Sequence, residues 1–316
     1  MANHRCFACD ENNPERIITT CDDGWIFNFI DRFVGPPGRA HGGIAIGALT
    51  CPALQLAEHD GMLNPVALHV TGRLNFPVPI AKPIRVTASQ ERGRYRVRMH
   101  EDSKVLLDGM VEVTDRETEV GTVLQEPPPG RIEDLKALAE LASVKIEGKT
   151  LFTQLRQNFE AAGLPWTGMR CFGCSEAEGA LKLHHRVARR GDTWTLWDGD
   201  RSFADDSGRL AVTIIAAVLD CSNQYTPTAD DPQFMIRVLR EKKIWMTGTY
   251  GVHFLRVPPI KIEGDYRVTA RYLGQKGRKL FSMSALLDRD GNVYAIGEAV
   301  AVILELPDEM LGSKGH

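Results

Sequence analysis

The sequence has no run of about 20 apolar residues, the length that a helix needs to cross a bilayer. Its best apolar segment, residues 210–219, is shorter and is followed by the charged Asp220. Residues 1–6 lead into polar sequence and lack the apolar core of a signal peptide. We therefore expect a cytoplasmic protein with no membrane partner.

A surplus of basic charge is also missing. The net charge of −3 disfavours nucleic acid as a partner, because such binding requires cations against the phosphates. The sequence contains no Gly-x-Ser-x-Gly elbow, phosphate-binding loop, dinucleotide fingerprint or His-Glu-x-x-His motif. It therefore gives no support to a serine hydrolase, a nucleotide triphosphatase or a zinc protease. The odd number of cysteines, 7, favours reduced thiols over a disulfide framework.

What the sequence does contain is an internal repeat. The stretch Arg-Cys-Phe-Ala-Cys at 5–9 returns as Arg-Cys-Phe-Gly-Cys at 170–174. Each copy then has an apolar segment of helical length that leads to a cysteine, 42–49 before Cys51 and 211–219 before Cys221. A length of 316 residues suits two such domains.

After each apolar segment the pattern alternates with a period near two, which is typical of antiparallel strands. The expected strands are 66–76, 84–89, 95–100 and 105–113 in the first copy, and 247–255, 266–273, 280–288 and 293–304 in the second. Residues 126–130, Glu-Pro-Pro-Pro-Gly, break the chain between the copies. Helical spacing at 132–141 and 151–161 predicts two linker helices. These features predict an α+β protein with domains at 1–125 and 166–316 and a helical linker at 126–165.

The segment 35–43, Gly-Pro-Pro-Gly-Arg-Ala-His-Gly-Gly, with the apolar helix after it, resembles hotdog-fold acyl-CoA thioesterases of the 4-hydroxybenzoyl-CoA and phenylacetate-pathway type. Residues 171–174 and 219–221 also resemble that superfamily. The resemblance implies a double hotdog: two antiparallel sheets, each wrapped around a central helix. It also implies an acyl-CoA or acyl-carrier thioester bound between the two units, and it leaves homo-oligomers possible.

The resemblance implies a site with two parts, and each copy retains one of them. Backbone N–H groups of Gly42 and Gly43 at a helix start are suited to an oxyanion hole, although two glycines can also simply start a helix that packs on another. The catalytic carboxylate of the family falls on Thr50 in the first copy and on Asp220 in the second. We therefore expect one composite site from Gly42, Gly43 and Asp220, with a raised pKa for Asp220 after so apolar a run. The alternative is that Asp220 leaves the helix into solvent.

Other residues have secondary roles in this interpretation. His41 is expected to orient the loop, and Glu58 is the fallback carboxylate, ranked lower because Pro52 disfavours an unbroken helix as far as Glu58. Coenzyme A phosphates require basic groups. The expected substrate-binding residues are Thr50, Arg94, Arg278 and Lys279.

The cysteines allow a competing interpretation. Cys6, Cys9, Cys171 and Cys174 form two Cys-x-x-Cys pairs with the spacing of a four-thiolate zinc site; small buried thiols are the default. Asp198, Asp200, Asp205 and Asp206 lack the pattern of a calcium loop. No metal or cofactor is predicted.

The predicted function is thioester hydrolysis. One alternative is a protein that binds an acyl thioester or another hydrophobic molecule without reaction. A second is a hydroxyacyl-thioester dehydratase, whose usual His/Asp pair is not evident in the sequence.

Overall fold

A computed structural model describes residues 7–36, 38–116, 119–144, 149–161, 171–176, 178–199, 201–204, 209–258 and 265–305. The first half contains β1 (Ile18–Cys21), β2 (Gly24–Phe27), η1 (Asp31–Phe33), α1 (Gly42–Ala48), α2 (Thr50–His59), β3 (Pro65–Leu74), β4 (Ile84–Glu91), β5 (Arg94–Glu101) and β6 (Lys104–Asp115). Then follow η2 (Pro129–Arg131), α3 (Ile132–Ala142) and α4 (Leu151–Ala161). The second half contains β7 (Arg186–Arg189), β8 (Asp192–Asp198), η3 (Arg201–Phe203), α5 (Val212–Asp230), α6 (Phe234–Arg240), β9 (Lys243–Phe254), β10 (Asp265–Lys276), β11 (Lys279–Leu287) and β12 (Val293–Glu305).

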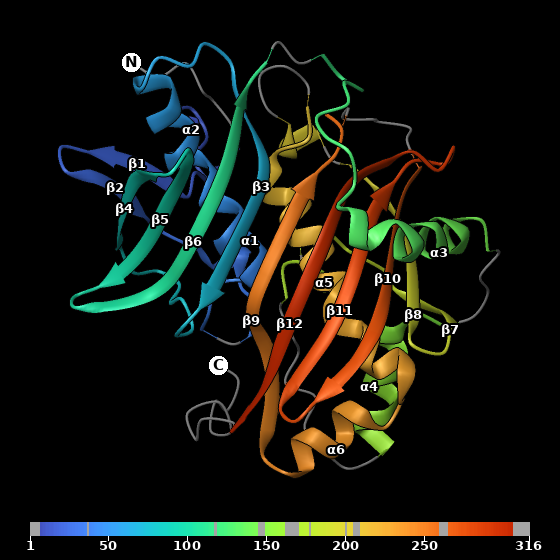
Figure 1. The fold of residues 1–316 in the computed structure, drawn as a ribbon. Coiled ribbons are helices and arrows are strands. Elements are labelled where there is room, and N and C mark those ends of the chain that lie inside the picture. Colours follow the sequence, from blue (N-terminus) through green and yellow to red (C-terminus); the bar gives the residue numbers. More distant parts are fainter. Residues whose placement is uncertain are drawn as a thin grey trace.

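The strands form one continuous antiparallel sheet where two separate sheets were predicted. Its order is β1-β2-β4-β5-β6-β3-β9-β12-β11-β10-β8-β7, so six strands of each half lie together (Figure 1). The halves join through β3 and β9, where Val70 lies opposite Val252 and Gly72 opposite Tyr250. In two separate sheets, β3 and β9 would each be an exposed edge strand. Their pairing gives both strands hydrogen-bond partners and removes these two edges.

The two halves repeat the same approach to a buried helix. A short 3-10 helix, η1 or η3, is followed by an isolated bridge, Val34 to Ala40 or Ala204 to Leu210, and then by α1 or α5. The phenylalanines of the Cys-Phe-x-Cys motifs pack with those of η1 and η3. Phe172 lies 5.1 Å from Phe33 and 6.0 Å from Phe203, and Phe7 lies 5.7 Å and 5.5 Å from the same two rings. The repeated motif therefore contributes aromatic core that joins the halves.

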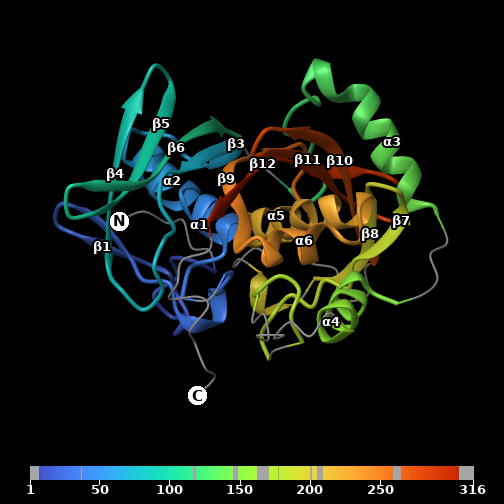
Figure 2. The same ribbon diagram turned by 90° about the horizontal axis from the view of Figure 1, so that it is seen from below.

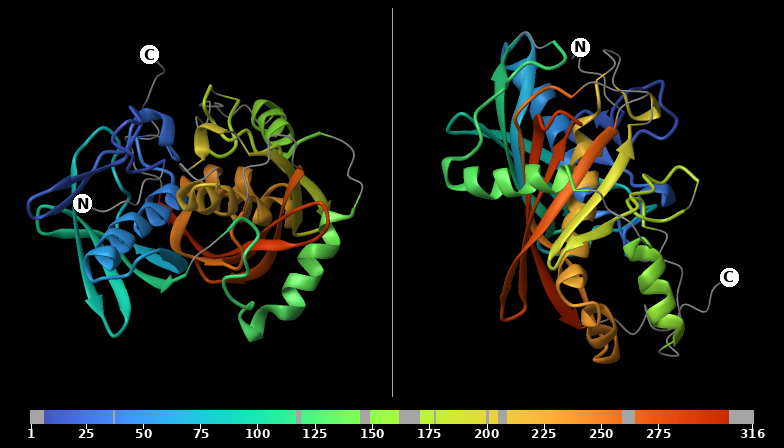
Figure 3. Two further views of the ribbon diagram at one scale, coloured as in Figure 1. Left: turned by 90° about the horizontal axis from the view of Figure 1, so that it is seen from above. Right: turned by 90° about the vertical axis from the view of Figure 1, so that its right-hand side faces the viewer.

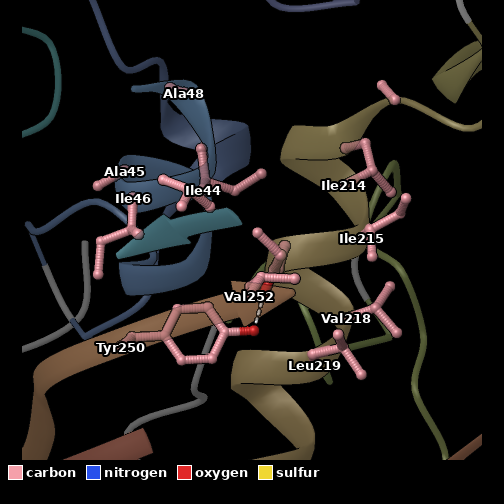
Figure 4. Close-up of a cluster of buried hydrophobic side chains, with 14 of the residues drawn as sticks. Ile44, Ala45, Ile46, Ala48, Ile214, Ile215, Val218, Leu219, Tyr250 and Val252 are labelled. Atoms are coloured by element: carbon pink, nitrogen blue, oxygen red, sulfur yellow. Dashed lines mark hydrogen bonds between the residues drawn. The ribbon is translucent and has the colours of Figure 1, made fainter. Parts of the chain in front are cut away.

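Helices α1 and α5 lie side by side inside the curve of the sheet (Figure 2). Apolar side chains of both helices pack around Tyr250, whose hydroxyl donates to the carbonyl of Ala216 at 2.9 Å (Figure 4). Gly43 and Gly47 make the close crossing possible. A Cβ on Gly43 would lie 2.5 Å from the Ala216 oxygen, and one on Gly47 would lie 2.8 Å from the Ala216 Cβ.

Two prolines adjust the helices without ending them. Pro52 lies in the first turn of α2, where a missing N–H is tolerated, and α2 reaches Glu58 after the single-residue break at Leu49. Pro227 lies inside α5, and the Thr226 hydroxyl donates to the Asn223 carbonyl that Pro227 leaves without a backbone donor. Helix α5 therefore extends well beyond the predicted segment.

The linker helix α3 covers the outer face of the second half (Figure 3). Its Leu135, Leu138 and Leu141 pack with Met283 and Leu287 of β11, while Ser284, between them, donates to Leu219 of α5 on the inner face. Both faces of β11 are covered, which explains why nearly all of its residues are buried.

All eight predicted strands and both linker helices are present, with ends shifted by a few residues. The short strands β1, β2, β7 and β8 and the helix α6 were not predicted.

Within the described part of the chain, no helix has the length and apolar character of a membrane span.

Candidate functional site

A cavity of about 880 Å³ opens between the two halves beside α1 and α5. This volume is within the range of small-molecule sites. Four basic residues line it, Arg39 and Arg73 from the first half and Arg278 and Lys279 from the second. Its apolar wall consists of Leu74, Phe76, Val78, Met235, Leu239, Ile244, Trp245, Met246, Phe281, Val300, Val302 and Leu304. A ligand with an apolar chain and an anionic end matches this lining.

Asp220 lies at the inner end of this cavity, in the middle of α5 and 2% exposed. Its Oδ2 accepts from the Gly43 N–H at 2.7 Å, and its Oδ1 accepts from the Thr247 hydroxyl at 2.9 Å. The Gln224 amide donates to Thr247 at 2.9 Å and to Asp220 Oδ1 at 3.4 Å. Burial raises the pKa of Asp220, against the opposing effect of His41 and these donors. The predicted desolvation is confirmed, and the solvent-exposed alternative is wrong.

Gly42 and Gly43 have different places in the site. Gly43 packs against α5 and gives its N–H to Asp220, so this N–H orients the carboxylate and is not free for an oxyanion. Gly42 lines the cavity. A Cβ on Gly42 would lie 2.9 Å from Thr247 Oγ1 and 3.0 Å from Asp220 Oδ2. The predicted meeting of Gly43 and Asp220 is confirmed, and Gly42 is the residue of the pair that lines the cavity.

His41 is the N-cap of α1 and is 4% exposed. Its Nδ1 lies 3.7 Å from Asp220 Oδ2, too far for a hydrogen bond. Burial disfavours its charge, yet the hydrogen bond with Cys171 and the negative charges of Cys171 and Asp220 raise its pKa. The structure therefore places a histidine and an aspartate from opposite halves side by side, a pair that the sequence did not reveal.

Two thiols, those of Cys171 and Cys221, lie close to His41, and a third, Cys174, lies beside them. Cys171, Cys174 and Cys221 contact one another, and all three line the cavity wall. Hydrogen bonds from Cys174 and Cys221 lower the pKa of Cys171 well below its usual range, and His41 acts in the same direction. Cysteine and imidazole are the ligands of thiophilic metals. Cys6, one of the four cysteines of the predicted zinc alternative, lies outside the described residues, as do Asp200, Asp205 and Asp206.

The other predicted residues divide by position. Arg278 and Lys279 are exposed at the edge of the cavity. Thr50 is buried outside it and donates to the Gly47 carbonyl, because it lies about two turns beyond Gly42, the residue of α1 that lines the cavity. Arg94 begins β5 and pairs with Glu112 at 2.9 Å, outside the cavity. Glu58 on α2 is also absent from the cavity lining.

Sequence reasoning missed Thr247, Gln224, Arg39 and Arg73. Gln224 carried a signal, since it follows Asp220 by one helical turn and must share its face. Thr247 meets Asp220 only through the packing of β9 on α5, and no local pattern encodes that contact.

No family model matches the sequence, and a search of curated proteins finds no match. Solved structures do resemble the chain. A conserved protein of unknown function with a hot dog fold from Alicyclobacillus acidocaldarius is 15% identical with a TM-score of 0.53, over 91% of this chain and 95% of that one. The tesB protein of Mycobacterium avium subsp. paratuberculosis is 12% identical with a TM-score of 0.53, over 91% and 96%. A protein assigned as thioesterase II from Thermobifida fusca is 11% identical with a TM-score of 0.51, over 96% and 99%. The chain has the hotdog fold.

Proposed function

We propose that the protein hydrolyses an acyl thioester at Asp220, in a composite site to which both halves contribute. The observation that carries this proposal is the hydrogen bond from Gly43 of α1 to the buried carboxylate of Asp220 in α5, at the inner end of the cavity. The assignment of a hotdog neighbour as thioesterase II supports it. Acyl-CoA and acyl-carrier thioesters share the acyl chain and the anionic end that the cavity lining fits.

Asp220 acts as a general base. A carboxylate offers about four lone-pair directions, and Gly43, Thr247 and Gln224 occupy three of them. The remaining direction accepts from a water molecule. That water attacks the carbonyl carbon, the C–S bond breaks, and the proton passes through Asp220 to the sulfur, which leaves as a thiol. The N–H of Gly42 stabilises the charge that develops on the carbonyl oxygen.

The basic residues of the cavity bind the anionic end of the carrier. Arg278 and Lys279 are exposed at the edge, where a phosphate of coenzyme A or of a phosphopantetheine group can reach them. The apolar wall takes the acyl chain.

Asp220→Asn tests the proposal, because the amide keeps the size of the carboxylate and cannot take the proton. We expect release of free thiol from a panel of acyl-CoAs to fall by about 10²–10⁴-fold. Asp230→Asn is the matched control, since Asp230 lies at the end of the same helix and pairs with Arg190 outside the cavity. Unchanged turnover by a folded Asp220→Asn protein would exclude Asp220 as the base.

A second candidate, dehydration of a 3-hydroxyacyl thioester, is favoured by the approach of His41 to Asp220 at 3.7 Å. The two reactions differ in product. Incubation with a 3-hydroxyacyl-CoA gives free thiol if the protein hydrolyses it and a conjugated enoyl thioester, without thiol, if the protein removes water. Binding without either product supports the non-catalytic alternative.

A further inference from the structure

We propose that Cys171, Cys221 and His41 bind a thiophilic divalent cation, with Zn²⁺ as the reference ion and Cys174 beside them as a fourth donor. One ligand atom from each of the first three residues lies within 4.8 Å of the others. The three residues come from separate segments: the motif turn 171–174, the middle of α5 and the N-cap of α1. This proposal goes beyond thioester hydrolysis and does not depend on it.

The spacing suits a tetrahedral ion. In a tetrahedral set, zinc bonds of about 2.3 Å to sulfur and about 2.0 Å to nitrogen put neighbouring ligand atoms about 3.5–3.8 Å apart. The ligand atoms of His41, Cys171 and Cys221 lie within 4.8 Å of one another, so small side-chain rotations bring them to these distances. Cys174 is 3% exposed and contacts both other thiols, so a short movement of its side chain completes a set of three sulfurs and one nitrogen.

Gly173 shows that the turn is shaped for this approach. A Cβ on Gly173 would lie 2.5 Å from Cys221 Sγ and 3.3 Å from His41 Nε2, so only glycine allows the turn to pack this closely against the two ligands. The first copy of the motif has Ala8 at the same place and keeps it buried. The N-cap that corresponds to His41 is Ala211 at the start of α5. The second copy of the motif is therefore the one with an imidazole opposite it.

Backbone hydrogen bonds hold the turn in place. The Phe172 N–H donates to Val34 at 2.7 Å, and the Phe172 and Gly173 carbonyls accept from Leu181 at 2.7 Å and Leu183 at 2.9 Å. The ligands are thus arranged by the fold, which lowers the conformational entropy that an ion must overcome.

The orientation of His41 also fits a metal ligand. Its Nε2 faces Gly173 and the thiols, and its Nδ1 faces Asp220 at 3.7 Å. Metal-bound histidines commonly direct their second nitrogen to a carboxylate. An ion at Nε2 would occupy the lone pair of that nitrogen and keep the ring beside Asp220, which gives His41 a positioning role and leaves it unable to exchange protons through Nε2.

Metal analysis tests the site directly. Untagged protein is reconstituted with Zn²⁺ under reducing conditions, freed of loose metal and measured by plasma mass spectrometry. We expect about one zinc per chain, a loss of at least about tenfold in Cys171→Ser and in Cys221→Ser, and no loss in Cys21→Ser, whose thiol is exposed in β1. Cobalt in place of zinc should show thiolate charge-transfer absorption that both site variants lose.

Two results would overturn the proposal: wild-type protein with less than about a tenth of a zinc per chain and freely titrating thiols, or undiminished zinc in both site variants. Thermal melting without metal shows whether each variant folds. Asp220→Asn separates the two proposals, since it should lose hydrolysis and retain zinc.

Discussion

At the scale of single residues, the site depends on how closely backbone and side chains approach Asp220. Gly42, Gly43 and Thr247 surround the carboxylate from two elements. The carboxylate is buried, so each lost donor leaves charge without compensation in a medium of low polarity. Small changes at Gly42 or Thr247 should therefore change the reaction more than the fold.

Gly42→Ala tests this residue-scale argument. The new Cβ would lie 2.9 Å from Thr247 Oγ1 and 3.0 Å from Asp220 Oδ2, so the hydrogen-bonded pair of Thr247 and Asp220 must shift. We expect kcat/KM for an acyl-CoA to fall by at least about tenfold, with little change in the free energy of unfolding. Gly130→Ala is the control because a Cβ there meets nothing within 4 Å. Equal kcat/KM values for the two variants would contradict the placement of Gly42.

Sequence reasoning chose its candidate residues from their positions along the chain. Gly43 and His41 were chosen as part of a helix start, and Asp220 was chosen by aligning the two copies on Cys51 and Cys221. Thr50 came from the same alignment and Arg94 from its position in a predicted hairpin, and the structure places both outside the cavity. Whether a residue faces the cavity depends on how two helices cross and on the direction of a hairpin. Those are tertiary properties.

At the scale of elements, the close crossing of α1 and α5 brings the two halves of the site together. Gly43 and Gly47 permit the crossing because a Cβ on either would overlap Ala216 of α5. The sequence predicted both helix starts correctly. It did not predict the break at Leu49, after which Pro52 lies in the first turn of α2. It also did not predict that α5 extends to Asp230, because the Thr226 hydroxyl bonds the carbonyl that Pro227 leaves without a donor. The missed β1, β2 and β7 are too short to show a period.

Gly43→Ala tests the crossing. Its Cβ would lie 2.5 Å from the Ala216 oxygen and 2.7 Å from the Ala217 Cα, both of them backbone atoms that cannot rotate away. We expect the free energy of unfolding in urea to fall by about 1–3 kcal/mol, against a change within about 0.5 kcal/mol for Gly130→Ala. A Gly43→Ala protein as stable as wild type would show that the helices are not so closely packed.

At the scale of the whole molecule, β3 and β9 join the halves into one sheet. His69 and His253 lie opposite each other at this junction and stack with ring centroids 4.0 Å apart. Burial and the neighbouring His253 lower the pKa of His69 to about 4, against Glu112 and Glu298. Burial also lowers the pKa of His253, with Arg131 in the same direction and the same two glutamates opposed.

This pair predicts a pH dependence of stability. In the unfolded chain both rings take up protons near pH 6.5, whereas in the folded chain they do so at lower pH. The junction is therefore most stable above about pH 6.5, and the free energy of unfolding should fall by about 1–3 kcal/mol as the pH decreases towards 4. Urea titrations at several pH values measure the effect. The double variant His69→Gln/His253→Gln should lose that part of the slope, because other histidines contribute equally in both proteins. Parallel slopes would contradict the role of the junction.

The central claim is that an acyl thioester binds between the halves with its carbonyl at Asp220. A crystal structure with a non-hydrolysable acyl-CoA analogue tests this most directly. We predict density for the acyl chain along the apolar wall, with the carbonyl carbon within about 4 Å of the Asp220 carboxylate, close enough for a water to bridge them. An analogue bound outside this cavity, or with its carbonyl directed away from Asp220 and Gly42, would contradict the account.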